Sequence, residues 1–538
     1  MKKKLLQVVG MLLCCSPSLT IAQAPKLGTA ADFVLFSSIG AVTQSGAAPS
    51  QLTGNIGGNA NASTGFGNVD GIMQDKNNVS AKCSLDLLAA YQTLKGTAKT
   101  LTLAPLLGNG QVLEKGVYDI ASAATLNLGL TLDAKNDENA VFIFKINGAF
   151  STNASSKVYL KNGALACNVF WMVEGLVNMA AGTTMRGTII VNNAAIVMAV
   201  GDTLEGRAMT TNGAITVSGI NARKPIGCGS VILNGPTAPD LGAAGCFALF
   251  SSTGDVANSG ITNVKGDVGS NTGAATGFDA KLVNGTIHSG PDNQTKQAAG
   301  DLLKAFNFTN LLQTDIELLF PNLFGNNLVL TPHTYYLNAA TNLKDTVYLN
   351  AQGNANAVFA FKVNGAFSTS VNAKVKLMNG AQSKNVYWAV TGAVTIAGNS
   401  TIEGTIMSSG AVGSLGAGVK LNGRALTVAG ALNTSAISAS TIPTGCLQTG
   451  VYDYEKVTKL ATIGPNPFKS SITISLNNAS LENGFELLIY NLVGDLIMKN
   501  LVTNQITTIE TSNLPSGLYT YKMISKNGDI QTGKIISQ

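Results

Sequence analysis

Apolar positions recur along this chain in step with small residues, at an interval of 19 residues. Val177, Ile196 and Ile215 follow this interval. The small residues that accompany it are Gly175, Ala194 and Gly213, then Gly392, Ala411 and Gly430. Short β-rich phrases at such a spacing, with small residues at the corners, are typical of a β-solenoid, whose coils bury their apolar sides against one another about 4.8 Å apart. A β-sandwich, which also consists of many short strands, is the alternative.

The same long sequence pattern occurs twice. Residues 27–38 reappear as 241–252, and residues 132–216 align without a gap to residues 217 positions later. In this alignment Trp171 pairs with Trp388 and Arg207 pairs with Arg424. We therefore predict two homologous β-solenoid domains, over residues 26–229 and 241–447, joined by a linker near 230–240.

One segment of each copy departs from the β pattern. Its apolar residues fall on one stripe at helical spacing, which predicts a helix that covers the side of each solenoid. The stripe consists of Val79, Cys83, Leu87, Leu88, Tyr91 and Leu94 in the first copy and of Ala298, Leu302, Leu303 and Phe306 in the second.

The two ends of the chain differ from the repeats. Lys2, Lys3 and Lys4 precede an apolar stretch that is too short to cross a bilayer, which predicts a signal peptide over residues 1–22. The mature chain contains no run of 18 apolar residues, so no transmembrane segment is expected. Residues 457–538 alternate apolar and polar positions between turns, which predicts a small antiparallel β-sandwich.

Composition argues against ionisable chemistry. Charged residues make up 12% of the 538 positions, against roughly 25% in an ordinary domain, and histidine occurs only twice. Most carboxylates do not recur between the copies, since Asp202 and Glu205 are replaced by Val419 and Asn422; Asp86, matched by Asp301, persists, but it falls on the predicted helix and is expected to be a solvated or salt-bridged side chain. The net charge of +6 is spread over a long chain and indicates no nucleic-acid groove. We expect no enzyme, no cofactor and no metal site.

The cysteines suggest disulfides, because an exported protein meets oxidising conditions. Cys83 and Cys167 are both missing from the second copy, and this joint loss predicts that they pair with each other. Cys246 opens the second domain and Cys446 closes it, so we expect these two to pair as well. Cys228 is then left without a predicted partner.

Small polar residues are the remaining candidates for function. Threonine, serine and asparagine stacked at a regular interval would form a flat, uncharged, half-apolar face, although threonine also favours strands for its own reasons. The residues that we select for such a face are Thr183, Thr184, Thr203 and Thr216 in the first copy, and Thr395, Thr401, Ser414 and Asn433 in the second.

Several phrases shared by the copies resemble a known family. Both contain Leu-Gly-x-Ala-x-x-Phe near the start, Asn-Ala-Val-Phe-x-Phe-Lys in the middle (139–145 and 356–362), and a Gly-Arg-Ala phrase (206–208 and 423–425). Each copy thereby resembles the β-solenoid ice-binding proteins of bacteria, fungi and algae. The resemblance implies a mainly β fold: a right-handed, discontinuous β-solenoid with one flanking α-helix and a flat face that adsorbs to ice.

The tail resembles a second family. Pro-Asn-Pro-Phe at 465–468 and Leu-Pro-Ser-Gly-Leu-Tyr at 514–519 are similar to phrases of the C-terminal sorting domain of the type IX secretion system of Bacteroidetes. This resemblance implies the type IX secretion machinery as a partner. It also implies that the protein is secreted or held at the outer-membrane cell surface.

Together these observations predict a non-catalytic protein that adsorbs to an ice crystal and inhibits ice growth or recrystallisation. A surface adhesin that binds glycans or cells is the main alternative. A polysaccharide-cleaving solenoid enzyme ranks third, because the carboxylate cluster that it requires is missing.

Overall fold

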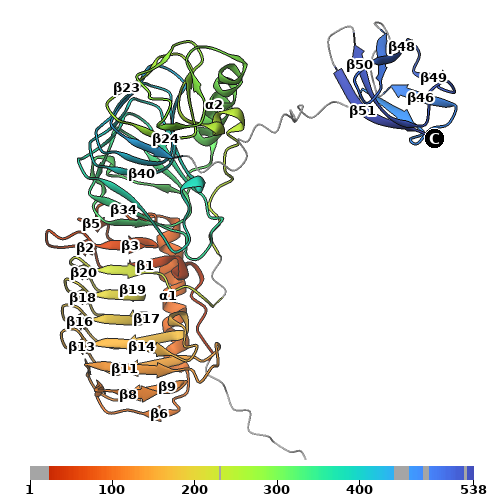
Figure 1. Ribbon diagram of the computed structural model, residues 1–538. Helices are drawn as coiled ribbons and strands as arrows, with labels where there is room; N and C mark the ends of the chain where they lie inside the picture. Colours follow the sequence, from red (N-terminus) through yellow and green to blue (C-terminus); the bar gives the residue numbers. More distant parts are fainter. Residues whose placement is uncertain (1–22, 229–231, 441–459, 477–483, 526–529) are drawn as a thin grey trace, which may run out of the picture. The chain divides into compact units, whose positions relative to one another are not determined.

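The computed structural model describes residues 23–228, 232–440, 460–476, 484–525 and 530–538. The chain divides into two compact units, residues 1–446 and 447–538 (Figure 1). The first unit contains two β-solenoids built from parallel strands, and the strands that the structure describes in the second pair antiparallel. The predicted signal peptide over 1–22 lies outside the described residues.

The first solenoid has two sheets. Its 13-stranded sheet comprises β1 (Phe33–Ser37), β3 (Gln51–Thr53), β4 (Asn55–Gly58), β6 (Leu101–Thr102), β8 (Gln111–Leu113), β9 (Gly116–Ile120), β11 (Gly129–Asp133), β12 (Phe142–Ile146), β14 (Lys157–Lys161), β15 (Val169–Val173), β17 (Thr184–Val191), β19 (Thr203–Thr210) and β21 (Asn221–Arg223). Its eight-stranded sheet comprises β2 (Val42–Gln44), β5 (Ser63–Thr64), β7 (Leu106–Gly108), β10 (Ala124–Asn127), β13 (Phe150–Thr152), β16 (Val177–Met179), β18 (Ile196–Met198) and β20 (Ile215–Val217).

The second solenoid repeats this plan. Its 15-stranded sheet comprises β22 (Phe247–Ser251), β24 (Asn263–Lys265), β25 (Asp267–Ser270), β27 (Val283–Asn284), β28 (Ile287–His288), β29 (Ile316–Glu317), β31 (Leu328–Leu330), β32 (Thr334–Leu337), β34 (Thr346–Asn350), β35 (Phe359–Val363), β37 (Lys374–Met378), β38 (Val386–Val390), β40 (Thr401–Ser408), β42 (Lys420–Thr427) and β44 (Ser438–Ser440). Its eight-stranded sheet comprises β23 (Val256–Ser259), β26 (Ala275–Thr276), β30 (Phe324–Gly325), β33 (Thr341–Lys344), β36 (Phe367–Thr369), β39 (Val394–Ile396), β41 (Val412–Leu415) and β43 (Leu432–Ser435).

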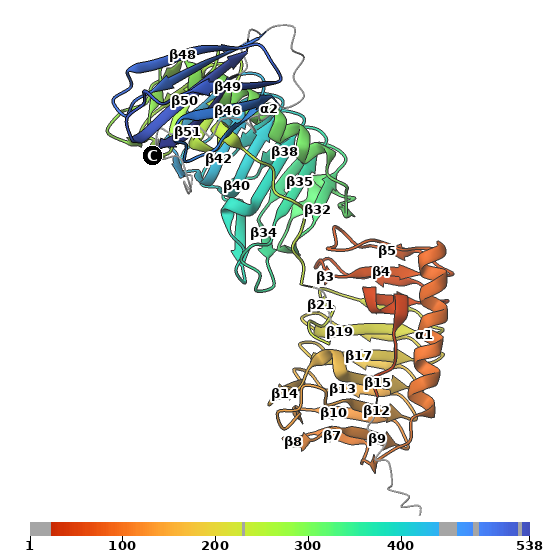
Figure 2. The ribbon, with the colours of Figure 1, turned by 90° about the vertical axis from the view of Figure 1, so that its right-hand side faces the viewer.

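The winding of each solenoid is discontinuous. Strand β1 pairs in parallel with β4 on one side and with the much later β19 on the other. Helix α1 (Asn78–Gly96) then connects this end of the solenoid to β6 at the opposite end, and the chain returns coil by coil to β21 (Figure 2). Helix α2 (Asn293–Leu311) has the same place in the second solenoid.

The predicted helices are confirmed, and each packs its apolar stripe against the larger sheet. Beneath α1, Leu87 and Leu94 are fully buried in one cluster with Phe170 and Ile190 of the sheet. Both helices begin with a capping box, formed by Asn77 with Ser80 and by Asp292 with Thr295. The apolar residues at the edge of the predicted stripes, Val79, Leu88 and Leu303, are exposed instead.

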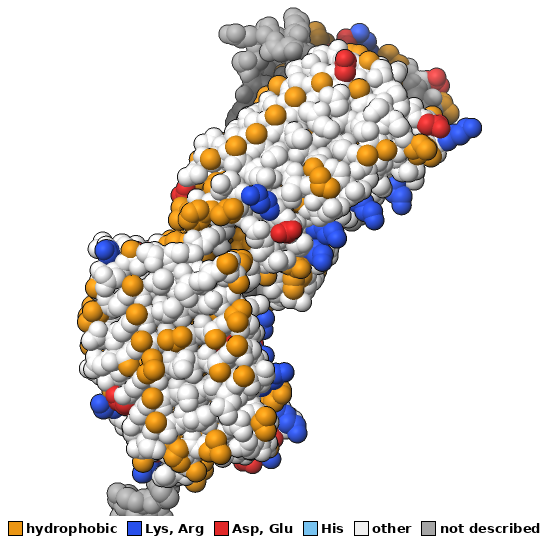
Figure 3. All heavy atoms as spheres, turned by 90° about the vertical axis from the view of Figure 1, so that its left-hand side faces the viewer, with side chains coloured by type: hydrophobic (Ala, Val, Ile, Leu, Met, Phe, Trp, Pro, Cys, Tyr) orange, Lys and Arg blue, Asp and Glu red, His pale blue; other side chains and the backbone are white. Residues whose placement is uncertain are grey.

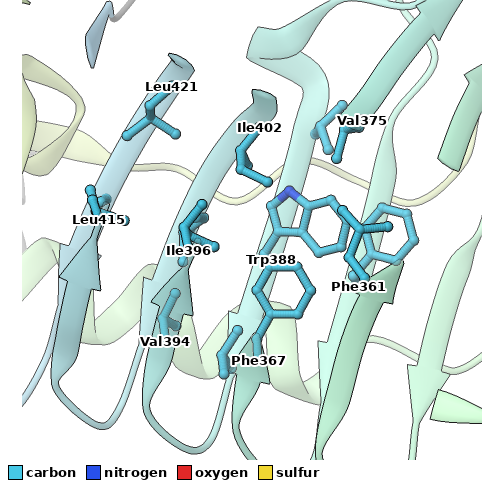
Figure 4. Close-up of a cluster of buried hydrophobic side chains, with 14 of the residues drawn as sticks. Phe361, Phe367, Val375, Trp388, Val394, Ile396, Ile402, Leu415 and Leu421 are labelled. Atoms are coloured by element: carbon cyan, nitrogen blue, oxygen red, sulfur yellow. The ribbon is translucent and has the colours of Figure 1, made fainter. Parts of the chain in front are cut away.

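Stacked aromatic rings fill the interior of each solenoid. In the second one, the indole of Trp388 stacks on Phe361 with ring centroids 4.0 Å apart and lies 5.3 Å from Phe367 (Figure 4). The indole nitrogen donates to the carbonyl oxygen of Glu403 at 3.0 Å. Trp171 repeats this stack in the first solenoid, with Phe144 at 4.0 Å. Successive coils are thus joined by aromatic contact as well as by backbone hydrogen bonds.

The predicted pairing of Cys83 with Cys167 is wrong. Cys167 forms its disulfide with Cys228, with 6.0 Å between the Cα atoms, and Cys83 is a free thiol buried under helix α1. Cys83 lies in the apolar cluster between helix and sheet, where burial raises the pKa of its thiol far above the ordinary value. Its absence from the second copy therefore reflects core packing. Cys246 is disulfide-bonded, and its expected partner, Cys446, lies outside the described residues.

The C-terminal unit packs two small antiparallel sheets around one apolar core. The three-stranded sheet has the order β45 (Ala461–Gly464), β46 (Ser471–Leu476), β49 (Ile506–Glu510), and the four-stranded sheet has the order β48 (Leu496–Val502), β47 (Phe485–Tyr490), β50 (Gly517–Ser525), β51 (Ile530–Ser537). Their shared core includes Ile472, Leu487 and Met523. This arrangement confirms the predicted small β-sandwich.

Candidate functional site

Most strands of the eight-stranded sheet of each solenoid present one outward residue to the solvent, which is short in nearly every strand; β30 (Phe324–Gly325) presents none. In strands such as β16, β18 and β20 a central residue points outward between two buried apolar neighbours. Because the strands pair in register, these central residues stack into a row. We call the row of the first solenoid the first ladder; it consists of Leu106, Thr125, Ser151, Asn178, Val197, Thr216, Thr43 and Thr64. We call the row of the second solenoid the second ladder; it consists of Asn342, Ser368, Thr395, Ser414, Asn433, Ala257 and Thr276.

The ladders carry short side chains and no charge. Hydroxyls of neighbouring strands interact along the first ladder, with 3.0 Å between the side-chain oxygens of Thr125 and Ser151 and 3.3 Å between those of Thr43 and Thr64. In the second ladder a register shift at Gly413 lets Asn433 donate to the Gly413 carbonyl at 3.2 Å. The space-filling view of this side of the solenoids is mostly uncharged, with most Lys and Arg near its margins and a basic side chain beside an acidic one farther in (Figure 3).

The larger sheets have a different chemistry. Lys157, Thr184 and Thr203 stand in register on β14, β17 and β19. Two residues along, Glu205 forms ion pairs with Arg186 at 3.2 Å and with Arg223 at 3.0 Å. These ion-paired side chains distinguish this face from the uncharged ladders.

The structure therefore divides the predicted face. Thr216, Thr395, Ser414 and Asn433 do stand on the two ladders. Thr184, Thr203 and Thr401 begin the long strands β17, β19 and β40 of the larger sheets, and Thr401 is flanked by Lys374 and Lys420. The expectation that all of these residues share one type of face is wrong.

Thr183 does not reach any surface, so its selection as a face residue is also wrong. It is fully buried at a corner of the coil, where its backbone nitrogen donates to Asp202 at 2.9 Å and its hydroxyl lies 2.7 Å from that of Thr152. Asp202 also accepts from the backbone nitrogen of Ala199 at 2.8 Å, and burial raises the pKa of its carboxyl to about 6. This carboxyl closes a turn, and Val419 occupies its place in the second copy.

Most ladder residues were missed by sequence reasoning. The missed members include Thr43, Thr125, Ser151, Asn178, Val197 and Ser368. The usable signal was the three-residue phrase in which one small or polar residue stands between two apolar ones, as in Val177-Asn178-Met179 and Ile196-Val197-Met198. Such phrases mark a strand that is buried on one side only.

No catalytic arrangement is visible in the described part of the chain. Within it, no group of three His, Cys, Asp or Glu side chains is placed to hold a metal ion. The two recurring arginines, Arg207 and Arg424, are buried and donate to the backbone carbonyls of Ala31 and Gly245 at 3.0 and 2.9 Å, so they hold coils together. The helices in the described ranges are also too short or too polar to cross a membrane.

Comparison with known proteins adds family matches. Residues 36–222 and 250–438 each match a family model described as "Ice-binding-like", and residues 462–538 match one described as "Secretion system C-terminal sorting domain". An ice-binding protein of Flavobacterium frigoris (strain PS1) is 34% identical over 200 residues, which are 34% of this chain and 70% of that protein. An ice-binding protein of Nostoc sp. (strain HG1) is 33% identical over 172 residues, 31% of this chain, and the match spans 62% of the Nostoc protein.

A solved structure matches both solenoids together. The crystal structure of an ice-binding protein from an Antarctic bacterium, Flavobacteriaceae, is 54% identical in sequence and superposes with a TM-score of 0.75. The match covers 78% of this chain and 99% of that protein.

Proposed function

Since the chain belongs to the ice-binding-like family, we propose that it binds ice through the two ladders of its eight-stranded sheets. The observation that carries this proposal is the stack of uncharged, mostly short side chains on each sheet, which is in register along the first ladder and shifted once at Gly413 in the second. The ladders replace the face predicted from the sequence, of which Thr216, Thr395, Ser414 and Asn433 remain members.

The chemistry of the ladders suits the ordering of water. Strand spacing repeats the outward groups about every 4.8 Å, and hydroxyl or amide groups can hold bridging water at little energetic cost. The methyl groups of threonine, valine and alanine separate these waters without competing for them. Charged groups, which hold their own hydration shells tightly, are absent from both ladders, although Lys344 of β33 is exposed two residues from Asn342. A rigid parallel sheet also loses little conformational freedom on adsorption.

The protein acts outside the cell. Its C-terminal unit matches a sorting domain, which indicates a secreted or cell-surface protein. We propose the type IX machinery as the system that recognises this unit, and we propose that the solenoids have no enzymatic activity. The alternative function, a glycan-binding adhesin, would require exposed aromatic platforms, and the ladders contain no aromatic residue.

Bulky substitutions test the ladders directly. Thr216→Tyr and Thr395→Tyr, each in the full chain, place a large ring in the middle of one ladder, and we expect lower thermal hysteresis and weaker inhibition of ice recrystallisation. Thr203→Tyr is the matched control, because Thr203 is a half-buried threonine at the edge of the larger sheet. Loss of activity in the control with full activity in the ladder variants would refute the assignment. Glycan binding by a wild-type protein that leaves ice growth unchanged would favour the adhesin.

A further inference from the structure

The two solenoids meet through a specific polar contact. Asp70, which follows β5 in the first solenoid, is 3% exposed, and its carboxylate accepts from the hydroxyl of Thr331 at 2.7 Å and from that of Tyr335 at 2.6 Å. Both hydroxyls belong to the second solenoid. Burial raises the pKa of the Tyr335 phenol well above its ordinary value, with the charge of Asp70 adding to the effect, so the phenol remains a donor.

Two other residue pairs complete this junction. The side chain of Asn68 accepts from the backbone nitrogen of Phe320 and donates to its carbonyl oxygen, both at 2.9 Å. The amide of Gln51 donates to the carbonyl of Asn326 at 3.2 Å. Asp70 itself is fixed by its backbone, which bonds to Leu52 at 3.0 Å and to Gly54 at 2.9 Å. The contact thus links two ordered surfaces rather than two loose side chains.

The connecting chain is tied to both solenoids. Its first residue, Cys228, is bonded to Cys167 of the first solenoid. Six residues on, Asn234 accepts from the backbone nitrogen of Val358 and from the side chain of Asn354, both at 2.8 Å, in the second solenoid. Six extended residues reach about 20 Å at most, so these two anchors limit any separation of the solenoids.

The corresponding outer ends of the two solenoids carry different residues. Asn284 stands in the second solenoid where Asp70 stands in the first, as the bridges of Thr53 with Asp70 and of Lys265 with Asn284 show. Glu114 stands in the first solenoid where Thr331 stands in the second. A junction between two first solenoids would therefore bring Asp70 against Glu114, and two buried carboxylates would repel each other.

From these contacts we propose that Asp70 is a positioning residue for ice binding: it locks the second solenoid onto the first, so that both ladders adsorb to one crystal as a single rigid unit. This inference rests on the proposed function of the ladders. Two linked surfaces gain from each other only if their geometry allows simultaneous engagement, and the junction fixes that geometry. Because Asp70 faces Thr331 here but would face Glu114 in a junction of two first solenoids, the contact also favours the pairing of a first solenoid with a second one.

The test introduces the repelling residue and then removes the repulsion. In the full chain, Thr331→Glu should raise hydrogen exchange in residues 66–73 and 318–335 and lower thermal hysteresis toward that of Thr395→Tyr. Thr331→Gln, of the same size but neutral, should change both readouts less. The double variant Asp70→Asn with Thr331→Glu should restore both, because it removes the like-charge pair. Asn284→Ala at the exposed, equivalent position should have no effect.

Each outcome bears on a separate statement. The lock is wrong if Thr331→Glu leaves hydrogen exchange unchanged or if the double variant is no better than the single one. Joint action of the ladders is wrong if Thr331→Glu opens the junction while thermal hysteresis stays at the wild-type value. A wild-type protein without any effect on ice growth overturns the proposed function instead, and hydrogen exchange still reports on the lock in that case.

Discussion

A histidine between two carboxylates makes the stability of the second solenoid depend on pH. The side chain of His288 is 5% exposed, with Nδ1 2.5 Å from a carboxylate oxygen of Asp292 and Nε2 3.9 Å from one of Asp267. The carboxylate of Asp267, followed by that of Asp292, holds the pKa of His288 above its ordinary value, against the opposite effect of burial. The first solenoid has the neutral pair Gln74 and Asn77 in this place, with a 2.7 Å hydrogen bond.

The sign of the effect follows from the raised pKa. The folded state binds the proton more tightly than the unfolded chain, so the stabilisation is complete below the ordinary histidine pKa and is lost as pH rises through the folded one. A hydrogen bond to a charged group contributes about 1.5–3 kcal/mol. Asp292 is 44% exposed, and solvent screening lowers the expected contribution to about 1–2 kcal/mol.

The double variant His288→Gln with Asp292→Asn copies the first solenoid and tests this reasoning. At pH 5.5 we expect the thermal transition of the second solenoid to fall by about 2–8 °C, from the usual 2–4 °C per kcal/mol for a domain of this size. At pH 9 the variant should melt close to the wild type. His333→Gln, which changes the remaining histidine, is the control. An equal loss at both pH values would refute the charge argument, because it would indicate a packing defect.

Three further changes test the solenoid interior. Trp388→Ala removes the ring that stacks on Phe361 at 4.0 Å, and chemical denaturation should show a loss of about 3–5 kcal/mol. Burial raises the pKa of the Asp202 carboxyl to about 6, so the folded state binds this proton more tightly than the unfolded chain does. Between pH 4 and 6.5 the free energy of unfolding of the wild type should therefore fall by up to about 3 kcal/mol relative to that of Asp202→Asn. The same pH dependence in both proteins would contradict this reasoning. Replacing Cys167 and Cys228 by serine removes a disulfide between residues with a sequence separation of 61, and the free energy of unfolding should fall by at most about 4 kcal/mol. An unchanged denaturation midpoint would show that the disulfide makes no such contribution.

The internal repeat allowed more of the fold than of the candidate site to be predicted from the sequence. A 19-residue period and a 217-residue offset favour coils and two copies, since stacked coils bury an apolar side at that interval, whereas a β-sandwich does not require so regular a spacing. Every face of a solenoid shares the same period, however. The phrase that begins at Thr184 and recurs at Thr203 therefore looked like a functional stack, although it begins the long strands beside charged residues. The cysteine pairing failed for a related reason, because absence from a second copy does not show which residues meet in space.

The two ladders differ at five of the seven positions where both have a member, with Ser151 matching Ser368 and Thr64 matching Thr276. What they share indicates how they would work in the proposed function. At equivalent positions the first ladder has Thr43 and Thr216 where the second has Ala257 and Asn433, and Asn178 is replaced by Thr395. A lattice of hydroxyls that matched ice atom by atom would not tolerate such exchanges. Absence of charge is retained throughout and small size everywhere except at Leu106, and both are properties that let a rigid sheet hold water in one pattern. Adsorption that depends on these properties should therefore survive an exchange of threonine for alanine or asparagine on a ladder and fail with lysine, glutamate or tyrosine at the same position.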